Sequence, residues 1–513
     1  MGGKFFYSQI ILSKDENQIP LCKNEETGQE ASLHSKYNPL REAESFVQNI
    51  DESCRFFVVL GLCGGYHIEK LLKKCPNSKI LVIEKSDSDI KFLSEIKCVK
   101  NLFCEKCVKI CPVSSVNESI LSFYKPALHG NLTILSLRAW ENAFESEAKL
   151  AREKINESIK LLAGDFSVQS HFGKIWQKNI LTNLKILGEA GACKDVGHPV
   201  ISLGTNEKIA AVIAAGPSLN ETISELKNNR KKYFIIATDT AFSSLTKQNV
   251  FCDAVVSIDG QNVSHEHYLE KLGENTIYAF DLCASPSSVR KALKFSRNVL
   301  FFESGHPLSQ YASFFDSQSP SHKNFIHLEA GSGTVTIAAA SLASVLGFSE
   351  LRFFGADFSY IKGSPYARGT YLESKFYSNS NRFNPAEKTY SALMFRTELK
   401  RLDEKTVTTE ILESYKNSLE EFMKKRETLR DCVSQNDQKC KQNFLNEILA
   451  KKSFDYESFI SKYCKELKES FKDGDFPLED TNASMTLLPY LAKVGKNFSF
   501  VAYLKKLEYN KNI

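Results

Sequence analysis

The chain has 513 residues, of which 42% are hydrophobic and 25% charged, and its formal net charge is +5. This length exceeds what one hydrophobic core usually supports, so two to four domains are expected. The composition is that of a globular protein, and no basic stripe interleaved with aromatic residues indicates a nucleic-acid surface. No stretch approaches the roughly 20 apolar residues of a membrane span.

The N-terminal sequence and the cysteines indicate in which cellular compartment the protein is expected. The stretch "MGGKFFYSQIILSKDENQIP" lacks the length and small-residue exit of a signal peptide, and Phe6 stands where N-myristoylation needs Ser or Thr. A cytoplasmic protein with reduced thiols is therefore expected. Four cysteines follow an incomplete metal-ligand spacing: Cys98, Cys104, Cys107 and Cys111. Because position 101 is Asn where an iron–sulfur motif needs Cys, thiols without a metal are favoured.

Residues 1–160 are expected to form a Rossmann-like domain. The strand-like runs "RFFVVLGL" and "KILVIEKS" flank a helical "YHIEKLLKKC", a βαβ pattern that predicts a parallel sheet. The turn Gly61–Gly65 opens this helix, and Glu84 ends the second strand. In dinucleotide and S-adenosylmethionine sites, such glycines allow close backbone approach and the acid binds ribose. A lone Gly-rich turn is weak evidence, so a structural domain is favoured over a working nucleotide site.

The remainder of the chain divides into three further expected regions. Residues 161–200 are a helical connector, within a charged stretch that predicts a helix pair. Residues 201–385 predict a doubly wound α/β domain, whose apolar strands alternate with helices. Its strands are "IAAVIAAG", "KYFIIATD", "DAVVSID", "TIYAFDL", "NVLFFES" and "LRFFGAD". The run "GTVTIAAASLASVLG" predicts a buried helix that ends at Gly347. Residues 386–513 are expected to be helical.

Polar residues follow the successive strands of the central domain: Gly216-Pro217-Ser218, Asp239, Asp259, Asp281, Glu303 and Asp357. Ligands of open α/β sheets bind beyond the carboxyl ends of the strands, so these residues should converge. The segment Glu329–Thr334, before the buried helix, predicts an anion site; a helix N-cap without a ligand is the alternative. Two D-x-D pairs, Asp87/Asp89 and Asp473/Asp475, are more typical of surface turns than of metal sites.

Taken in order, "IAAGPSLNE", "ATDTAF", "VVSIDG", "GSGTVTIAAASLASVLGFSELRFFGADFSY" and "KGSPYARGTY" resemble the motility accessory factor family of flagellin glycosyltransferases. The same pieces look like bacterial sialyltransferases that use CMP-sialic acid. The resemblance covers residues 209–371 well, and residues 1–160 resemble the family's Rossmann-like N-terminal domain more loosely. It implies inverting transfer of a nonulosonic acid (pseudaminic, legionaminic or sialic type) from CMP to Ser or Thr of flagellin. That reaction supports flagellar assembly and motility.

The resemblance also implies roles for single residues. The donor side would comprise Gly216, Pro217, Ser218, Asp239, Asp259, Ser332, Gly333 and Thr334. Tyr360 and Tyr366 match, after one inserted residue, two tyrosines that hydrogen-bond the leaving phosphate, and Asp357 completes the candidate catalytic set. Ala215 stands where the sialyltransferases have Asn; this departure removes a side-chain contact and leaves the backbone donors of the turn.

The implied chemistry needs no metal or cofactor. Negative charge grows on the phosphate as CMP leaves, and two phenols can stabilise a monophosphate leaving group. The acceptor hydroxyl needs a base, yet the general-base His of the sialyltransferases has no counterpart, because no His follows His327. Asp259, His306 and Asp357 remain as candidate bases.

Three alternatives stay open. The first is a diphosphokinase related to the archaeal-type 6-hydroxymethylpterin enzymes, which would need ATP and magnesium. The second is a non-catalytic factor that binds flagellin, and the third is a methyltransferase that works through the Gly61–Gly65 turn. The exact sugar, the linkage and the oligomeric state, including a homo-oligomer, are also left open.

Overall fold

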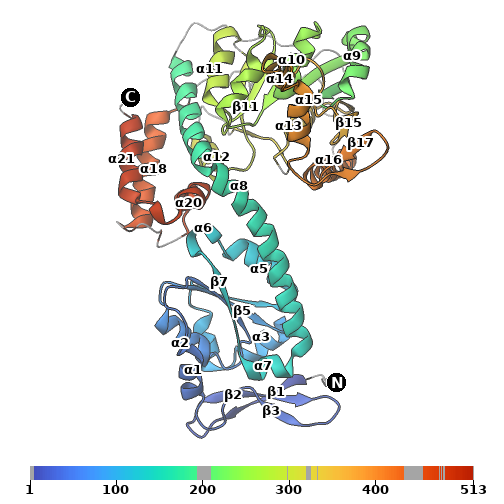
Figure 1. Cartoon of the computed structure of the whole chain (residues 1–513). Helices are drawn as coiled ribbons and strands as arrows, with labels where there is room; N and C mark the ends of the chain where they lie inside the picture. The colour runs from blue at the N-terminus through green and yellow to red at the C-terminus, as the bar shows by residue number, and fades with distance from the viewer. Residues whose placement is uncertain are drawn as a thin grey trace. The chain divides into compact units, whose positions relative to one another are not determined.

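The computed structural model describes residues 5–192, 209–296, 298–318, 325–331, 333–432, 454–472, 474, 477 and 480–511. These residues form two compact units (Figure 1). Unit 1 comprises Met1–Gly173 and Leu488–Phe498, and unit 2 comprises Lys174–Leu487 and Ser499–Ile513. Both contain parallel sheets covered by helices, which confirms the α/β class. The finer boundaries at residues 160, 200 and 385 stay a prediction.

Unit 1 combines a small antiparallel sheet with a four-stranded parallel one. The antiparallel sheet has the order β1-β2-β3, and the parallel sheet has the order β6-β5-β4-β7. The strands are β1 (Phe5–Leu12), β2 (Gln18–Asn24), β3 (Glu30–Ser32), β4 (Phe56–Leu60), β5 (Lys79–Glu84), β6 (Val108–Pro112) and β7 (Leu132–Ser136). The continuous apolar runs of β4 and β5 are buried on both faces, as parallel strands between helix layers require.

The helices of unit 1 connect these strands in chain order. They are α1 (Pro39–Val47), α2 (Tyr66–Lys74), α3 (Asp87–Leu93), α4 (Lys97–Leu102), α5 (Val116–Phe123), α6 (Pro126–His129), α7 (Arg138–Ala143) and α20 (Leu488–Val494). The βαβ pattern expected around Gly61–Gly65 is confirmed by β4, α2 and β5. The strands β6 and β7 were not among the expected elements, because their runs are short and only partly apolar.

One helix replaces the expected helix pair. α8 (Glu145–Ala192) is continuous over 48 residues. Its N-terminal half contributes Ala148, Ala151 and Ile155 to the core of unit 1, while Ile180 and Leu184 of its C-terminal half are buried in unit 2. No Pro interrupts the stretch, and Gly is tolerated inside a helix whose two ends are held by packing. The prediction of two helices was therefore wrong.

Unit 2 is built on a seven-stranded parallel sheet of order β13-β12-β11-β10-β9-β8-β14. The strands are β8 (Ile209–Ile213), β9 (Tyr233–Thr238), β10 (Ala254–Ser257), β11 (Ile277–Asp281), β12 (Val299–Glu303), β13 (Ile326–His327) and β14 (Leu351–Phe354). All six expected strands are present, and β13 is added at the edge. The order reverses at β8, which lies between β9 and β14, so the sheet is doubly wound and its switch point is there.

Helices cover both faces of this sheet. They are α9 (Leu219–Asn228), α10 (Asp239–Lys247), α11 (Pro286–Phe295), α12 (Pro307–Ser317) and α13 (Val335–Val345), with a 3₁₀ helix η3 (Asn262–Tyr268) after β10. α13 is buried nearly all round, as its sequence predicted. The helix ends where Gly347 adopts a φ of +83° and Phe348 N–H donates to Ala343 O, which confirms the expected glycine stop.

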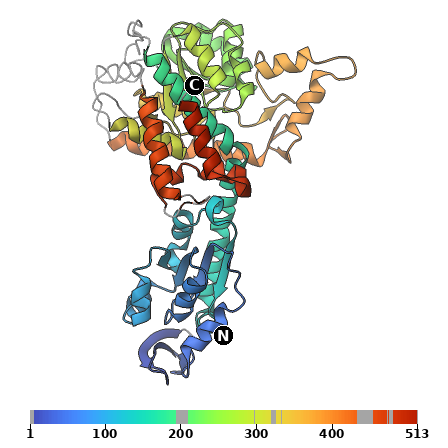
Figure 2. The ribbon, with the colours of Figure 1, turned by 90° about the vertical axis from the view of Figure 1, so that its left-hand side faces the viewer.

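The rest of unit 2 is mostly helical. After the sheet come α14 (Tyr371–Ser378), α15 (Ala386–Met394), α16 (Glu410–Cys432), α18 (Tyr456–Phe471), α19 (Asn482–Met485) and α21 (Phe500–Lys511). A small antiparallel sheet, β15 (Tyr360–Ile361), β17 (Thr406–Thr408) and β16 (Lys400–Arg401), is a strand element that the sequence did not predict. Figure 2 shows the segment with α14 and α15 projecting from the rest of unit 2. None of the described helices has the length and apolarity needed to cross a membrane.

Candidate functional site

The turn after β8 lies at the switch point and is held by the segment that follows β14. Ser218 donates to Asp357 through its amide, 2.8 Å from Oδ2, and through its hydroxyl. The amide of Gly216 donates to Gly355 O at 2.8 Å. A Cβ on Gly216 would collide with the Asp357 carboxylate and with Gly355 O, so only glycine fits here.

This arrangement bears on two expectations. The amides of Gly216 and Ser218 are engaged inside the turn, so the backbone donors expected for a ligand are not left over at these residues. Asp357 accepts from Ser218 with both carboxylate oxygens, which suits a residue that shapes the turn better than a base. The neighbouring loop also clamps the turn, because Ala367 N–H donates to Ala215 O at 2.8 Å. Contact of Gly216, Pro217 and Ser218 with a nucleotide stays a prediction.

Asp239 follows β9 and is almost fully buried at 2% exposure. Its Oδ2 accepts from the hydroxyl of Ser257 at 2.6 Å, and its Oδ1 accepts from the amide and hydroxyl of Thr240. The carboxylate therefore ties the ends of β9 and β10 together.

Asp259 follows β10 and differs from Asp239 in that it is only half-buried. Its Oδ1 accepts from the Gln261 amide at 2.9 Å, and within the described part of the chain its Oδ2 has no hydrogen-bond partner. Burial raises the pKa of Asp259, the Gln261 amide opposes this, nearby Asp239 raises it further and His267 lowers it. A partly exposed carboxyl with a raised pKa can exchange a proton.

His267 and Tyr371 pack against each other within electrostatic range of Asp259. His267, in η3, is 5% exposed, and its Nδ1 is buried with no partner among the described residues. Its ring meets that of Tyr371 edge to face, with centroids 4.2 Å apart. Burial raises the pKa of Tyr371 to about 12, with further contributions from Glu266, Tyr366, Asp259 and Asp239. Tyr371 thus lies within electrostatic range of both strand-end carboxylates and of Tyr366.

The two predicted phosphate-binding tyrosines lie close to each other and share a cation. Tyr360 begins β15, Tyr366 lies in the loop between β15 and α14, and both are half-buried. Burial raises the pKa of both phenols, Tyr360 adds to the rise at Tyr366, and Arg396 lowers both values. At neutral pH both phenols are therefore protonated donors, near a guanidinium that is itself exposed.

The loop before α13 supplies a helix N-terminus. Thr334 is the N-cap, and its hydroxyl oxygen accepts from the Thr336 amide at 3.3 Å. Gly331 and Gly333 have φ values of +53° and +89°. Ser332 lies outside the described residues. The capping bond favours the N-cap interpretation for Thr334, and the donor-binding roles of Ser332, Gly333 and Thr334 stay predictions.

The C-terminal half of α8 covers the β11 side of the same sheet edge. Asn179 donates to Gly260 O and Cys283 O, and Asn183 donates to Leu282 O and Ala284 O, all between 2.8 and 3.0 Å. His306, a candidate base, is the N-cap of α12. Burial lowers its pKa to about 3, and its ring meets Trp176 at 5.9 Å. Because Nδ1 accepts from the Leu308 amide and Nε2 is buried, this half-buried histidine is a poor base for an incoming acceptor.

The sheet edge of unit 1 is occupied by the unit's own side chains. Glu84 is fully buried and accepts from the Tyr7 hydroxyl at 3.1 Å, the Leu62 amide at 2.9 Å, the Lys85 amide at 2.8 Å and the Trp140 indole at 2.7 Å. Burial raises the pKa of Glu84, while these four donors oppose the rise. The carboxylate has no capacity left for ribose hydroxyls.

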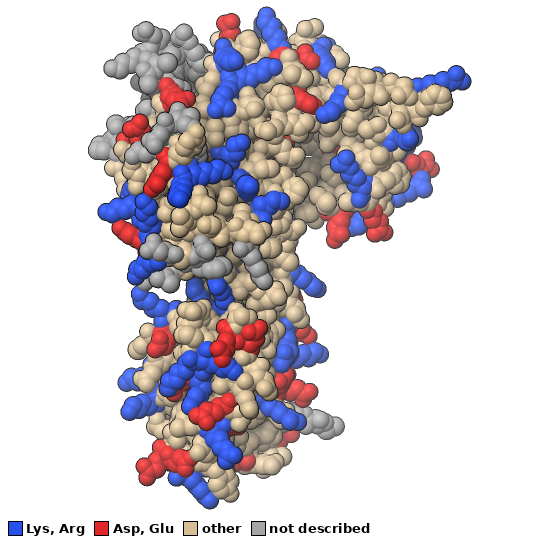
Figure 3. All heavy atoms as spheres, turned by 60° about the vertical axis from the view of Figure 1, so that its left-hand side comes forward, with Lys and Arg blue, Asp and Glu red and all other residues tan. Residues whose placement is uncertain are grey.

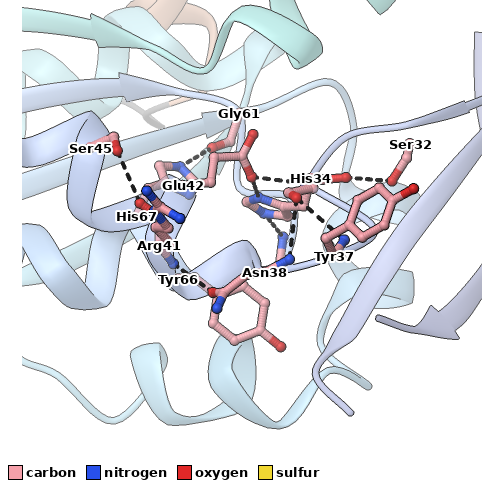
Figure 4. Close-up of polar contacts among 12 residues, drawn as sticks. Ser32, His34, Tyr37, Asn38, Arg41, Glu42, Ser45, Gly61, Tyr66 and His67 are labelled. Atoms are coloured by element: carbon pink, nitrogen blue, oxygen red, sulfur yellow. Dashed lines mark hydrogen bonds and ion pairs between the residues drawn. The ribbon is translucent and has the colours of Figure 1, made fainter. Parts of the chain in front are cut away.

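His34 fills the position beside the glycine turn, as Figure 4 shows. The Gly64 amide donates to His34 Nε2 at 3.0 Å, so the ring proton is on Nδ1, which donates to Glu42 at 3.0 Å. Gly61 has a φ of +99°, and a Cβ there would lie 2.7 Å from the Trp140 ring. The glycines thus allow close approach of protein side chains, which supports the structural interpretation of this turn.

The remaining motif candidates have ordinary surroundings. Cys104 is exposed, Cys107 is half-buried and Cys111 is buried. Asp87 and Asp89 lie in the first turn of α3, where Ser86 accepts from the Asp89 amide, so they are helix-start residues and not a turn. Asp473 and Asp475 lie outside the described residues. Within the described ranges, no group of three or more His, Cys, Asp or Glu has a geometry that could hold a metal ion.

Comparison with known proteins agrees with this architecture. Residues 178–363 match the family model "6-hydroxymethylpterin diphosphokinase MptE-like". Two proteins of Treponema pallidum (strain Nichols), both described as uncharacterized, are 36% and 32% identical over 207 and 156 residues. These matches span 38% and 30% of this chain and 71% of each relative.

The chain belongs to the family of these Treponema proteins. It also has the fold of the MAf glycosyltransferase from Magnetospirillum magneticum AMB-1, with a TM-score of 0.52 at 14% identity. That likeness covers 98% of this chain and 85% of the other. The Maf-type fold and the MptE-like domain confirm the resemblance that the motifs between residues 209 and 371 indicated.

Sequence reasoning missed three residues that the structure brings to the site. His267 lies eight positions after Asp259, inside "QNVSHEHY", and could have been found by searching the loops at the carboxyl ends of the strands for histidine. Tyr371 ends the quoted "KGSPYARGTY". Arg396 gave no signal, because it lies 30 positions after Tyr366 beyond two short helices.

Proposed function

We propose that the protein is a glycosyltransferase that moves a nonulosonic acid from a CMP donor onto Ser or Thr of flagellin. The observation that carries the proposal is the pair Tyr360 and Tyr366, which lie together with Arg396 in a chain of Maf-type fold. Asp239 and Asp259 end the neighbouring strands, and Tyr371 lies within range of both carboxylates and of Tyr366. These side chains therefore gather at one edge of the MptE-like domain.

The proposed reaction builds up negative charge on the leaving phosphate, and the site residues can stabilise it. Breaking the bond between the anomeric carbon and the phosphate oxygen leaves the electron pair on CMP, and the sugar passes through an oxocarbenium-like state. Two protonated phenols and a guanidinium can stabilise the growing negative charge. Because the leaving group is a monophosphate, no metal ion is required in this scheme, and inversion at the anomeric carbon is expected from direct attack by the acceptor.

Exposed aromatic residues support a protein acceptor. Figure 3 shows Lys and Arg interspersed with Asp and Glu on the face in view, with no broad patch of one sign. The projecting segment carries exposed aromatic residues, Tyr377 at 54%, Phe383 at 90% and Phe395 at 71% exposure. Exposed aromatic side chains near a site suit contact with a polypeptide.

The intact mass of flagellin from cells that lack this protein tests the proposal. The expected result is a loss of mass equal to whole nonulosonic acid residues, restored by the wild-type gene. Restoration should fail with Tyr366→Phe and succeed with Tyr377→Phe, an exposed tyrosine of α14. An unchanged flagellin mass would contradict the proposal.

A second candidate is favoured by the MptE-like match, which spans residues 178–363. A pterin diphosphokinase would bind ATP with magnesium and transfer a diphosphate to a hydroxymethyl group. Isothermal titration separates the two functions: a glycosyltransferase should bind CMP without magnesium, whereas a diphosphokinase should bind ATP only with it.

A further inference from the structure

The base that accepts the proton of the acceptor hydroxyl can be chosen by elimination among the candidate bases Asp259, His306 and Asp357, with Asp239 added. Both carboxylate oxygens of Asp357 accept hydrogen bonds from Ser218. The carboxylate oxygens of Asp239 accept hydrogen bonds from Ser257 and Thr240. His306 is enclosed beside Trp176 as a helix N-cap. Asp259 and Asp357 are both half-buried, and of the described carboxylates that follow β9, β10 and β14 only Asp259 has an oxygen without a hydrogen-bond partner.

The surroundings of Asp259 suit a base. The buried His267 lies within electrostatic range of it and has an unpartnered Nδ1, and the Tyr371 ring meets the imidazole edge to face with centroids 4.2 Å apart. Behind Asp259, Gly260 packs against Trp176 and Asn179, which carry no charge. The charged and titratable groups that face Asp259 are therefore Asp239 at the start of α10, His267 in η3 and Tyr371 at the start of α14. Tyr371 in turn links this group to Tyr366.

We propose that Asp259 is the general base of the transfer, and that His267 is a positioning residue that acts on this carboxylate electrostatically, without a hydrogen bond to it. This inference rests on the proposed function and moves Asp259 from the donor nucleotide to the acceptor. In the reaction, the acceptor O–H proton passes to the free Oδ2 of Asp259. The acceptor oxygen forms the bond to the anomeric carbon, and the anomeric carbon–phosphate oxygen bond breaks with its electron pair leaving on CMP.

The pH dependence has a definite sign. A base must be deprotonated, so the transfer rate should rise with pH through the raised pKa of Asp259. His267 lowers that pKa. Removing the imidazole should therefore shift the acid limb of the rate profile to higher pH, while a merely structural role would leave the limb in place.

The test uses the full-length chain with flagellin and CMP-pseudaminic or CMP-legionaminic acid, and CMP alone for binding. Asp259→Asn should slow transfer by about 10²-fold or more, with CMP affinity within about threefold of wild type. Asp259→Glu should recover part of the rate. His267→Phe, which keeps a ring against Tyr371, should shift the acid limb upward. His265→Phe is the matched control, since this exposed histidine lies on the same 3₁₀ helix.

Each contrary result has its own meaning. Equal losses of CMP affinity and rate in Asp259→Asn would overturn the base assignment and return Asp259 to the donor site. An unchanged rate in Asp259→Asn would overturn it as well. An acid limb that stays in place in His267→Phe would overturn the role of His267. A wild-type protein that binds no CMP and transfers neither sugar would overturn the proposed function and, with it, this inference.

Discussion

The two parallel sheets of this chain differ in whether the polar groups at the carboxyl ends of their strands are occupied by other side chains. In unit 1, Glu84 and the Gly61–Gly65 turn are saturated by Tyr7, Trp140 and His34 of the same unit. In unit 2, Asp259 and the tyrosines at positions 360, 366 and 371 remain partly exposed. The same strand–turn–helix geometry therefore builds a closed core in one case and a candidate site in the other. What differs is which side chains the adjoining elements bring to the edge.

Glu84→Ala should have the largest effect. It leaves four buried donors without an acceptor, which should lower the free energy of unfolding of unit 1 by at least about 3 kcal/mol. Urea unfolding followed by the fluorescence of Trp140, in a Trp176→Phe background, measures it. CMP affinity should not change. Glu69→Ala is the control. The ion pair of Glu69 with Lys73 is exposed, so its loss should lower the free energy of unfolding by about 0.5 kcal/mol or less. Normal unfolding with altered nucleotide binding would mean that the edge is a ligand site after all.

Tyr366→Phe comes next. The loss of one donor to the leaving phosphate should slow transfer about 10²-fold, while CMP affinity stays within about threefold. Initial rates with saturating donor, together with calorimetry of CMP, separate these quantities. A fall in thermal stability with an unchanged rate would show that Tyr366 is a packing residue, and unit 2 would then resemble unit 1 more than we infer.

The buried His67 predicts an acid-sensitive unit 1. Burial lowers the pKa of His67 to about 3 from an ordinary 6.5. At pH values between about 3 and 6.5, His67 is therefore protonated in the unfolded chain and neutral in the folded chain. Stability is therefore lost as pH falls below about 6.5, by up to about 1.4 kcal/mol per pH unit. Urea unfolding between pH 7.5 and 5 should show this slope, and His67→Phe should flatten it. His171→Phe, exposed in the same unit, should keep the slope; a slope that survives in His67→Phe would refute the assignment.

Arg396→Gln should have the smallest effect. Its guanidinium is exposed and screened by solvent, so removing it should weaken CMP binding by about threefold, more at low salt than at high salt. Titrations at two salt concentrations measure this. The neighbouring Lys388→Gln, whose amine contacts Asn384, is the control and should leave binding unchanged. An equal effect of both substitutions would point to general charge and not to a phosphate contact.

Much of the fold could be predicted from the sequence, because buried parallel strands read as continuous apolar runs. β8 to β12, β14 and the buried helix α13 were all identified in this way. The short β13 and the small sheet of β15–β17 were not, since a two-residue strand leaves no periodic signal. The continuity of α8 was missed because charge patterns do not distinguish one long helix from two shorter ones.

The candidate site was only partly predictable. The strand-end rule identified Asp239, Asp259 and Asp357 as neighbours of one edge. It could not show that both oxygens of Asp357 accept hydrogen bonds from Ser218, while one oxygen of Asp259 has no partner among the described residues. Which hydrogen bonds a carboxylate accepts depends on tertiary contacts, which a local sequence pattern does not define. His267 and Arg396 reach the site from loops and helices whose paths no local pattern defines.

The self-filled edge of unit 1 has a consequence for how the cell's metabolites act on the protein. A sheet that binds a nucleotide at this edge gains stability from the ligand, by an amount that grows with the logarithm of the free ligand concentration. Here His34, Tyr7 and Trp140 supply equivalent contacts at a fixed effective concentration, because they belong to the same chain. The stability of unit 1 should therefore not follow nucleotide or S-adenosylmethionine levels, and only unit 2 should respond to its substrate.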